Sequence, residues 1–389
     1  MIRFLGLDVK NSALFSISFA FMAVACINPL LTAIADYGHR KKVFLRFFCY
    51  LGSVSCALLY FFTTETTTFS VFAFVLATIG YSGSLVFYNA YLPDIATEDR
   101  YDGVSARGYA LGYIGSVLLL LFNLSMILMP GWYGGISEGL ASRIAFLTTG
   151  LWWALFAQYT FRHLPHETPR REPGWAWLFN GYRELRKVLG ELAQQRVLKR
   201  YLIAFFFYSA GVQTVMYVAA IAADQVLRLP ADNLIITILI IQLVAIAGAY
   251  GFAALSRRYG NLKTLMGAVV VWVGICFWCY AVQGAQELYA LATLIGLVMG
   301  GIQALSRSTY AKLIPAQTPD TVSYFNFYDG LEKLSIVSGT LMFGLVTQLT
   351  GKLRSTFIVL AFVFGVGLLF LSRIIPEKKP PRSVELAEM

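Results

Sequence analysis

Three charged residues lie together inside one otherwise apolar segment, at positions 324–349. These are Asp329, Glu332 and Lys333, and charges deep in a membrane are costly and usually functional. Counted from Tyr324 at 1.5 Å per residue, Lys333 lies roughly 14 Å inside, close to the middle of a bilayer. Asp329 and Lys333 are spaced i,i+4 and can pair on one helix face. Glu332 points about 100° away from Lys333 and needs another partner or water. We expect Lys333 to anchor a carboxylate and one acid to carry a proton; the alternative is a self-neutralising structural pair.

Single polar side chains in other apolar segments could complete a cavity around this cluster. Each of them alone is more often a hydrogen bond between helices than a contact to a ligand. Gln213 and Gln303 are our first candidates, because both lie well inside their segments. The wider set consists of Tyr328, Tyr88, Asn89, Asn28, Asn123, Gln158, Tyr208 and Gln242.

The elements that must position these residues are long apolar segments. Of 389 residues, 58% are hydrophobic and 13% charged, whereas roughly a quarter of a soluble domain is charged. Mean hydropathy is +0.64 over the whole chain. The segments are continuous apolar runs, which predict spanning helices and not the alternating strands of a barrel. We predict eleven of them, at 12–34, 43–63, 69–92, 108–129, 143–161, 200–223, 233–255, 265–283, 288–305, 324–349 and 355–372.

Basic residues indicate how these segments are oriented. A net charge of +10 would suggest nucleic acid in a soluble protein, but here the excess lies in loops. Most Lys and Arg follow the odd-numbered segments, and we count Arg307 and Lys312 among these loop residues. Loops on the other side hold Arg228, Lys352 and Arg354. By the positive-inside trend, the basic loops and the C-terminus are cytoplasmic, in a multi-pass inner-membrane protein without a nucleic-acid partner.

A long basic loop divides the chain into two lobes. We predict an N-terminal lobe of five helices at 1–161, a cytoplasmic linker at 162–199, a C-terminal lobe of six helices at 200–372 and a cytoplasmic tail at 373–389. Within the linker, residues 175–197 carry an apolar stripe at helical spacing. This stripe predicts an amphipathic helix at the membrane surface.

One short basic loop recurs in both lobes. Residues 35–42 and 256–263 each contain Tyr-Gly and several cations, and the glycine permits a sharp turn between two helices. The first loop also contains Asp36 and Arg40. We expect Asp36 to form a cytoplasmic latch with Arg107, or with Arg100 as the second choice. Glycine residues also recur at helical spacing in two segments, and such small residues on one helix face favour close packing of helices. They are Gly108, Gly112, Gly115, Gly296, Gly300 and Gly301.

The recurring loop resembles the signature loop of the major facilitator superfamily, although Tyr37 stands where that pattern has Arg after the Asp. Residues 83–96, 104–115 and 300–308 look like its vacuole-effluxer-like branch, first known from autophagy-related vacuolar proteins. Phe325 and Tyr328 fit the same branch. The resemblance covers nearly the whole chain and implies a two-lobed helical bundle with a central cavity. It also implies transport by alternating access, and fungal members are linked to amino-acid efflux from the vacuole.

We therefore expect a secondary active transporter for a small polar or zwitterionic solute, such as an amino acid, with a coupling proton or solute gradient and lipid around it. The alternatives are an exporter of an amphipathic compound or lipid, and a non-transporting receptor or scaffold. No P-loop motif is present, so ATP drive within this chain is not expected. We expect no cofactor, no metal site and no enzymatic activity, since we find no triad and no paired CxxC beside Cys276 and Cys279.

The N-terminal lobe has one predicted helix fewer than the six usual in the superfamily. The signature loop follows our first segment, whereas it normally joins the second and third helices. Residues 1–10 are too few for another span, so we expect the usual first helix to be absent. This predicts a groove in the N-terminal lobe, next to our fourth and fifth segments.

Overall fold

The structure is a computed structural model that describes residues 3–4, 7–8, 40–63, 65–165, 176–225, 231–315, 318 and 320–374. Apart from a pair of two-residue antiparallel strands, β1 (Arg3–Phe4) and β2 (Leu7–Asp8), this part of the chain is helical. The longer helices are α2 (Lys41–Leu58), α3 (Thr67–Ala90), α5 (Tyr101–Leu128), α6 (Glu138–His163), α7 (Ala176–Gln194), α8 (Arg196–Gln225), α9 (Ala231–Tyr259), α10 (Asn261–Ala281), α11 (Ala285–Leu313), α12 (Thr321–Thr350) and α13 (Ser355–Ser372). Short helices connect some of them: η1 (Leu59–Phe61), α4 (Leu92–Ile95), η2 (Glu98–Arg100) and η3 (Pro130–Tyr133).

The predicted apolar segments agree with these helices. Every segment from 43–63 onward coincides with one long helix, and 175–197 coincides with α7. Eight helices within the described ranges are long and apolar enough to cross a membrane. The predicted segment 12–34 lies outside the described residues. The absence of the usual first helix, and the groove that it would leave, therefore stay predictions. The predicted helical membrane bundle is confirmed.

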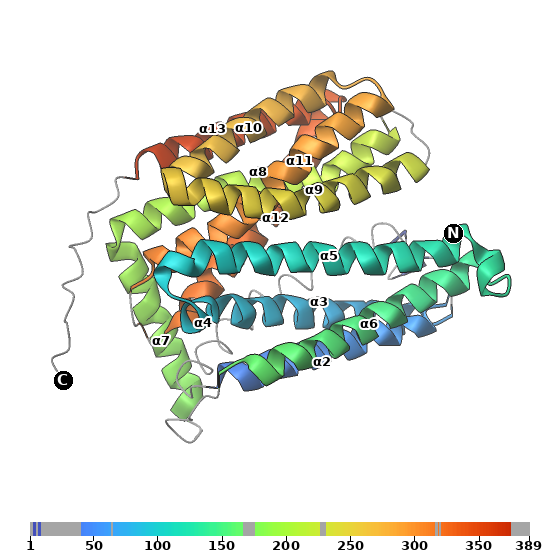
Figure 1. Cartoon of the computed structure of the whole chain (residues 1–389), viewed down its shortest axis with the longest axis horizontal. Helices are drawn as coiled ribbons and strands as arrows, with labels where there is room; N and C mark the ends of the chain where they lie inside the picture. Colours follow the sequence, from blue (N-terminus) through green and yellow to red (C-terminus); the bar gives the residue numbers. More distant parts are fainter. Residues whose placement is uncertain are drawn as a thin grey trace.

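The helices form two groups that pack against each other, which we call the two lobes (Figure 1). In one group α2 packs on α3 and α6; in the other, α11 packs on α9, and α13 packs on α8 and α10. The groups meet mainly where α5 contacts α9 and α11, and where α12 contacts α3. Side chains from both groups therefore face one another along α5, α11 and α12.

Glycine permits the closest of these helix contacts. A Cβ atom on Gly300 would collide with the main-chain carbonyl of Ala245, and one on Gly296 would meet the carbonyl of Ile241. Since backbone cannot move aside as a side chain can, α9 and α11 need glycine here. By contrast, a Cβ atom on Gly112 would meet nothing within 4 Å. The predicted small face is therefore used on α11, whereas Gly112 on α5 serves no packing contact.

Helix α7 lies across one end of the bundle, which we call the α7 end (Figure 1). Its Val188 and Leu192 are buried. The Lys187 Nζ atom lies 2.9 Å from the Asp320 carboxylate, and the Tyr324 hydroxyl donates to Glu191. The predicted amphipathic helix thus docks on the first turn of α12. Its location at a membrane surface stays a prediction.

Candidate functional site

The charged cluster on α12 is packed as its spacing predicts. The Lys333 Nζ atom lies 3.1 Å from Asp329 Oδ1, and both residues are buried. A buried pair of this kind is stable only while both partners are present. Thr321 begins α12 at the α7 end, so this pair lies two to three turns into the helix.

Glu332 is hydrogen-bonded to a side chain of another helix, which the sequence alone could not identify. Its Oε1 atom accepts a hydrogen bond from Gln213 Nε2 of α8 at 3.0 Å, and its Oε2 atom lies 3.8 Å from Lys333 Nζ. The second distance is too long for a hydrogen bond. One oxygen of Glu332 is therefore held by Gln213, while the other makes only a loose ion pair.

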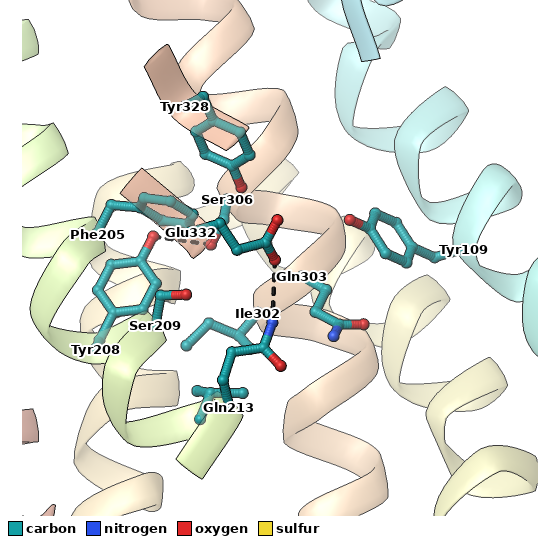
Figure 2. Close-up of a pocket in the computed structure, with 11 residues that line it drawn as sticks. Tyr109, Phe205, Tyr208, Ser209, Gln213, Ile302, Gln303, Ser306, Tyr328 and Glu332 are labelled. Atoms are coloured by element: carbon teal, nitrogen blue, oxygen red, sulfur yellow. Dashed lines mark hydrogen bonds between the residues drawn. The ribbon is translucent and has the colours of Figure 1, made fainter. Parts of the chain in front are cut away.

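A narrow cavity lies beside Glu332. Figure 2 shows the Glu332 carboxylate near its centre, with the hydroxyl groups of Tyr109 and Tyr328 pointing toward it. The two lobes both contribute, because Tyr109 belongs to α5 and the other lining residues belong to α8, α11 and α12. The lining consists of Tyr109, Phe205, Tyr208, Ser209, Val212, Gln213, Ile302, Gln303, Ser306, Tyr328 and Glu332.

The cavity brings together several residues that the sequence singled out, but not all of them. Gln213, Gln303, Tyr328 and Glu332 line it, as does Tyr208 from the wider set. Asp329 and Lys333 stand behind this lining, in contact with Glu332 only through Lys333. Sequence reasoning missed Tyr109, Phe205, Ser209 and Ser306. Tyr109 and Ser306 lie in the segments 104–115 and 300–308 that carry the family resemblance, which could have singled them out. Phe205 and Ser209 lie in an apolar run full of aromatic and small residues, where nothing in the sequence distinguishes them.

Two polar side chains of the cavity are fixed by neighbours. Gln303 accepts a hydrogen bond from the Tyr113 hydroxyl, and the Tyr208 hydroxyl lies 2.8 Å from Ser306 Oγ. Hydrogen bonds that connect a site to surrounding helices hold its polar groups in place. The cavity is therefore a prearranged polar site with a single carboxylate.

Arg307 is buried on α11, not placed in a loop as we expected. It is 3% exposed, because α11 continues to Leu313, eight residues beyond the predicted end of the segment. Its guanidinium donates to the Ser105 hydroxyl, the Ser105 carbonyl and Asn89 Oδ1, at 3.0, 3.2 and 3.3 Å. A planar guanidinium can be buried when its N–H groups find such acceptors.

Aromatic rings complete the surroundings of Arg307. Its guanidinium carbon lies 5.1 Å from the ring centre of Tyr88 and 5.0 Å from that of Tyr109, which allows cation–π attraction. Tyr88 and Asn89, both predicted as cavity residues, thus contact Arg307 and do not line the cavity. Gly108 makes room for this arrangement, since a Cβ atom there would lie 3.1 Å from Arg307 Nη2.

A second charged cluster joins the lobes at the α7 end. Asp102 of α5 accepts hydrogen bonds from Lys312 at 2.7 Å, from Asn261 at 2.7 Å and from Ser256 at 3.0 Å. Ser256 and Asn261 belong to the recurring basic loop of the second lobe. Lys312, which we counted as a loop residue, belongs to α11 and is mostly buried. Sequence reasoning missed Asp102, which is 4% exposed.

The predicted latch of Asp36 stays a prediction, because Asp36 lies outside the described residues. Of its proposed partners, Arg107 is exposed. Arg100 is also exposed and lies 3.9 Å from Asp99. Arg40 stands directly before α2. The latch that the structure does describe at this end is formed by Asp102, through the second copy of the recurring loop.

Comparison with known proteins places this arrangement in a family. The model of a family described as "Vacuole effluxer Atg22 like" matches residues 1–382 of the chain. The chain belongs to this Atg22-like family. An uncharacterized MFS-type transporter of Bacillus subtilis, YxiO, is 31% identical over 366 residues, which are 94% of this chain and 84% of the relative. Autophagy-related protein 22 of Kluyveromyces lactis is 25% identical over 93% of this chain and 79% of its own length.

Solved structures show the same fold for this Atg22-like protein. The major facilitator transporter FucP in an outward conformation aligns with a TM-score of 0.72 at 13% identity, over 95% of this chain and 91% of FucP. The proton:xylose symporter XylE aligns with a TM-score of 0.72 at 13% identity, over 96% of this chain and 88% of XylE. The chain is therefore a multi-pass membrane transporter of the major facilitator type. The resemblance noted in the sequence is confirmed.

Proposed function

We propose that this Atg22-like protein moves a small polar or zwitterionic solute, with amino acids as first candidates, by alternating access. The observation that carries the proposal is the cavity beside Glu332, to which both lobes contribute. Its lining of hydroxyl, amide and carboxylate groups suits a small polar solute better than a lipid or a large amphipathic compound. Family membership supports efflux, and proton symporters among the structural neighbours support coupling to a proton.

The contacts between the lobes support a mechanism in which one end opens at a time. Asp102 and Arg307 both bridge the lobes on the α7 side of the bundle. Opening that end requires these bonds to break together, while the lobes close elsewhere around the solute. If the basic side is cytoplasmic, as its charge predicts, this conformation is closed toward the cytoplasm.

We assign the coupling role to the α12 cluster. A proton on Asp329 would remove the negative charge that holds Lys333 at 3.1 Å. Lys333 would then be free to anchor a carboxylate of the solute. Glu332, between this pair and the cavity, is the second candidate for the proton carrier. Protonation of Asp329 would thus allow Lys333 to bind the solute, so that binding of the solute depends on protonation of α12.

Transport itself is tested with purified protein in proteoliposomes. A panel of radiolabelled amino acids is offered with and without an imposed pH gradient. We expect at least one of them to accumulate above its equilibrium level, and a protonophore to abolish this accumulation. Absence of flux for the whole panel, with folded protein in the vesicles, would favour the receptor or scaffold alternative.

The proton-carrier role has its own test in the variant Glu332→Gln. The groups around Glu332 are Lys333 and Asp329 on α12, Gln213 and Tyr208 on α8, Tyr109 on α5 and Tyr328 one turn earlier on α12. We expect the variant to change the dependence of the transport rate on pH. A pH profile identical to that of the wild type would remove Glu332 from this role.

A further inference from the structure

We infer that the cavity recognises a protonated amine, so that its ligand class is small organic ammonium compounds with an apolar or planar body. This inference rests on the proposed function, because it names the solute group that the same cavity binds. It differs from that proposal in one respect: the ammonium group, and not a carboxylate, is the required feature of the solute.

Charge inside the bundle gives the first argument. The α12 cluster holds two carboxylates and one ammonium group, and the tighter of the two ion pairs joins Lys333 to Asp329. Glu332 is left as the excess negative charge of this cluster, and it is the only charged residue of the cavity lining. A carboxylate in a site of low dielectric constant attracts a cation more strongly than it would in water.

The other buried cation near the cavity does not neutralise Glu332. Arg307 directs its N–H groups to Ser105 and Asn89, on α5 and α3. Among the described residues it forms no ion pair within 4 Å, with Glu332 or with any other acid. Its position beside Tyr109 places a positive charge at one wall, so an entering ammonium group should approach Glu332 from the side of Tyr328 and Gln213.

Hydrogen-bond acceptors give the second argument. A primary ammonium group offers three donors and no acceptor. Within the described ranges, Glu332 Oε2 has only its loose ion pair, and Gln213 uses its amide nitrogen but not its oxygen. Figure 2 shows the Tyr328 hydroxyl pointing toward the same carboxylate, and no hydrogen bond occupies it within the described part of the chain. The Glu332 and Tyr328 oxygens can accept from two N–H donors of one ammonium group, whereas the Gln213 oxygen is directed away from Glu332 (Figure 2).

The remaining walls suit an apolar or planar body. Phe205 and Tyr328 stack with ring centres 4.2 Å apart, and Val212 and Ile302 add aliphatic surface. An anionic solute entering here would meet the Glu332 carboxylate before it could reach Lys333. A neutral polyol would leave the Glu332 charge with only its loose contact to Lys333 at 3.8 Å.

Three ligands with the same phenyl body separate these cases: phenylalanine carries both an amine and a carboxylate, phenethylamine only the amine, and 3-phenylpropionate only the carboxylate. Binding to the full chain in detergent is measured by isothermal titration calorimetry, with myo-inositol as the neutral polyol. We expect phenylalanine and phenethylamine to bind, and 3-phenylpropionate and myo-inositol to bind at least about tenfold more weakly.

The Glu332→Gln variant tests whether this carboxylate is responsible. It keeps the size of the side chain and its bond to Gln213, so we expect phenethylamine affinity to fall at least about tenfold, the range for a lost hydrogen bond between charged groups. The matched control is Glu138→Gln, at an exposed carboxylate in the first turn of α6. We expect it to bind like the wild type.

Several outcomes would overturn the inference. Binding of 3-phenylpropionate or myo-inositol as tight as that of phenethylamine would do so, and so would a failure of all these ligands to bind, or an unchanged affinity in the folded Glu332→Gln variant. Flux is measured separately in proteoliposomes. Amine binding without flux would contradict the proposed transport function but support the amine site. Flux of amine-free solutes alone would support transport but contradict the amine site.

Discussion

Two buried charged clusters of this protein differ in how fully their carboxylate oxygens are hydrogen-bonded. The cluster at the α7 end surrounds Asp102 with donors from Lys312, Asn261 and Ser256, so both of its oxygens are occupied. The cluster on α12 leaves one oxygen of Glu332 with a loose contact at 3.8 Å. A fully bonded cluster stabilises one arrangement of the lobes, whereas a cluster with spare bonding capacity can accept a solute or a proton.

The two clusters also differ in how they are built. Asp329, Glu332 and Lys333 share one helix and can stay together while the lobes move. The partners of Asp102 are on the other lobe, so any relative movement at the α7 end separates them. We therefore expect changes in the α12 cluster to affect binding and coupling, and changes around Asp102 to affect the balance between conformations.

The largest effect should follow removal of the α12 cation. Lys333→Ala leaves Asp329 buried without its partner, and breaking a buried pair costs roughly 3–5 kcal/mol. We expect transport to fall at least about a hundredfold, while size-exclusion chromatography still shows folded protein. Lys352→Ala, at an exposed lysine, is the control. Normal transport by folded Lys333→Ala would show that the anchor role is wrong.

A double variant shows whether charge or structure is lost. Asp329→Asn with Lys333→Gln removes both charges and keeps hydrogen-bonding side chains of similar size. We expect this variant to regain stability relative to Lys333→Ala, because no buried charge is left unpaired. Transport should stay lost. Recovery of transport would mean that the pair has only a structural role.

The next effect should be a conformational one. Asp102→Asn removes the charge that binds Lys312 but keeps the side-chain size. Loss of charged hydrogen bonds should favour opening of the α7 end about tenfold. Hydrogen–deuterium exchange over residues 256–263 should be faster by the same factor. Asp99→Asn, at an exposed carboxylate nearby, should leave this exchange unchanged, and equal exchange in both variants would contradict the latch.

A smaller effect should come from crowding Arg307. In Gly108→Ala the new Cβ atom would lie 2.6 Å from the Tyr88 hydroxyl and 3.1 Å from Arg307 Nη2. Since both neighbours are ends of flexible side chains, they can shift at moderate cost. We expect transport to change by about two- to fivefold, corresponding to an overpacking cost of roughly 1 kcal/mol. Gly112→Ala, with nothing within 4 Å, should transport normally.

The smallest effect should be found at the contact between α7 and α12. Lys187→Gln removes an ion pair whose lysine side chain is 49% exposed. Partly exposed pairs contribute about 0–1 kcal/mol, and a value near the middle of that range corresponds to a change in transport of about twofold. A loss as large as that of Asp102→Asn would give α7 a part in the conformational balance.

The sequence by itself determined the local features. Long apolar runs must form helices in lipid, where every backbone polar group needs an internal partner. Most ends of the long helices agree with the predicted segments within about five residues, but α5 begins seven residues before its predicted start and α11 ends eight residues after its predicted end. Spacing along one helix predicted the pair of Asp329 and Lys333, and the resemblance predicted the family.

Only the tertiary structure decided which distant residues meet. The partners of Asp102 lie 154 to 210 positions away along the chain, and Tyr109 reaches the cavity from the other lobe. Arg307 looked like a loop residue, because a cation following an apolar run usually marks the end of a span. It is buried because Ser105, Asn89, Tyr88 and Tyr109 supply its acceptors and rings. Helical periodicity predicts which residues share one face of a helix. Which other helix that face contacts depends on how the two lobes pack.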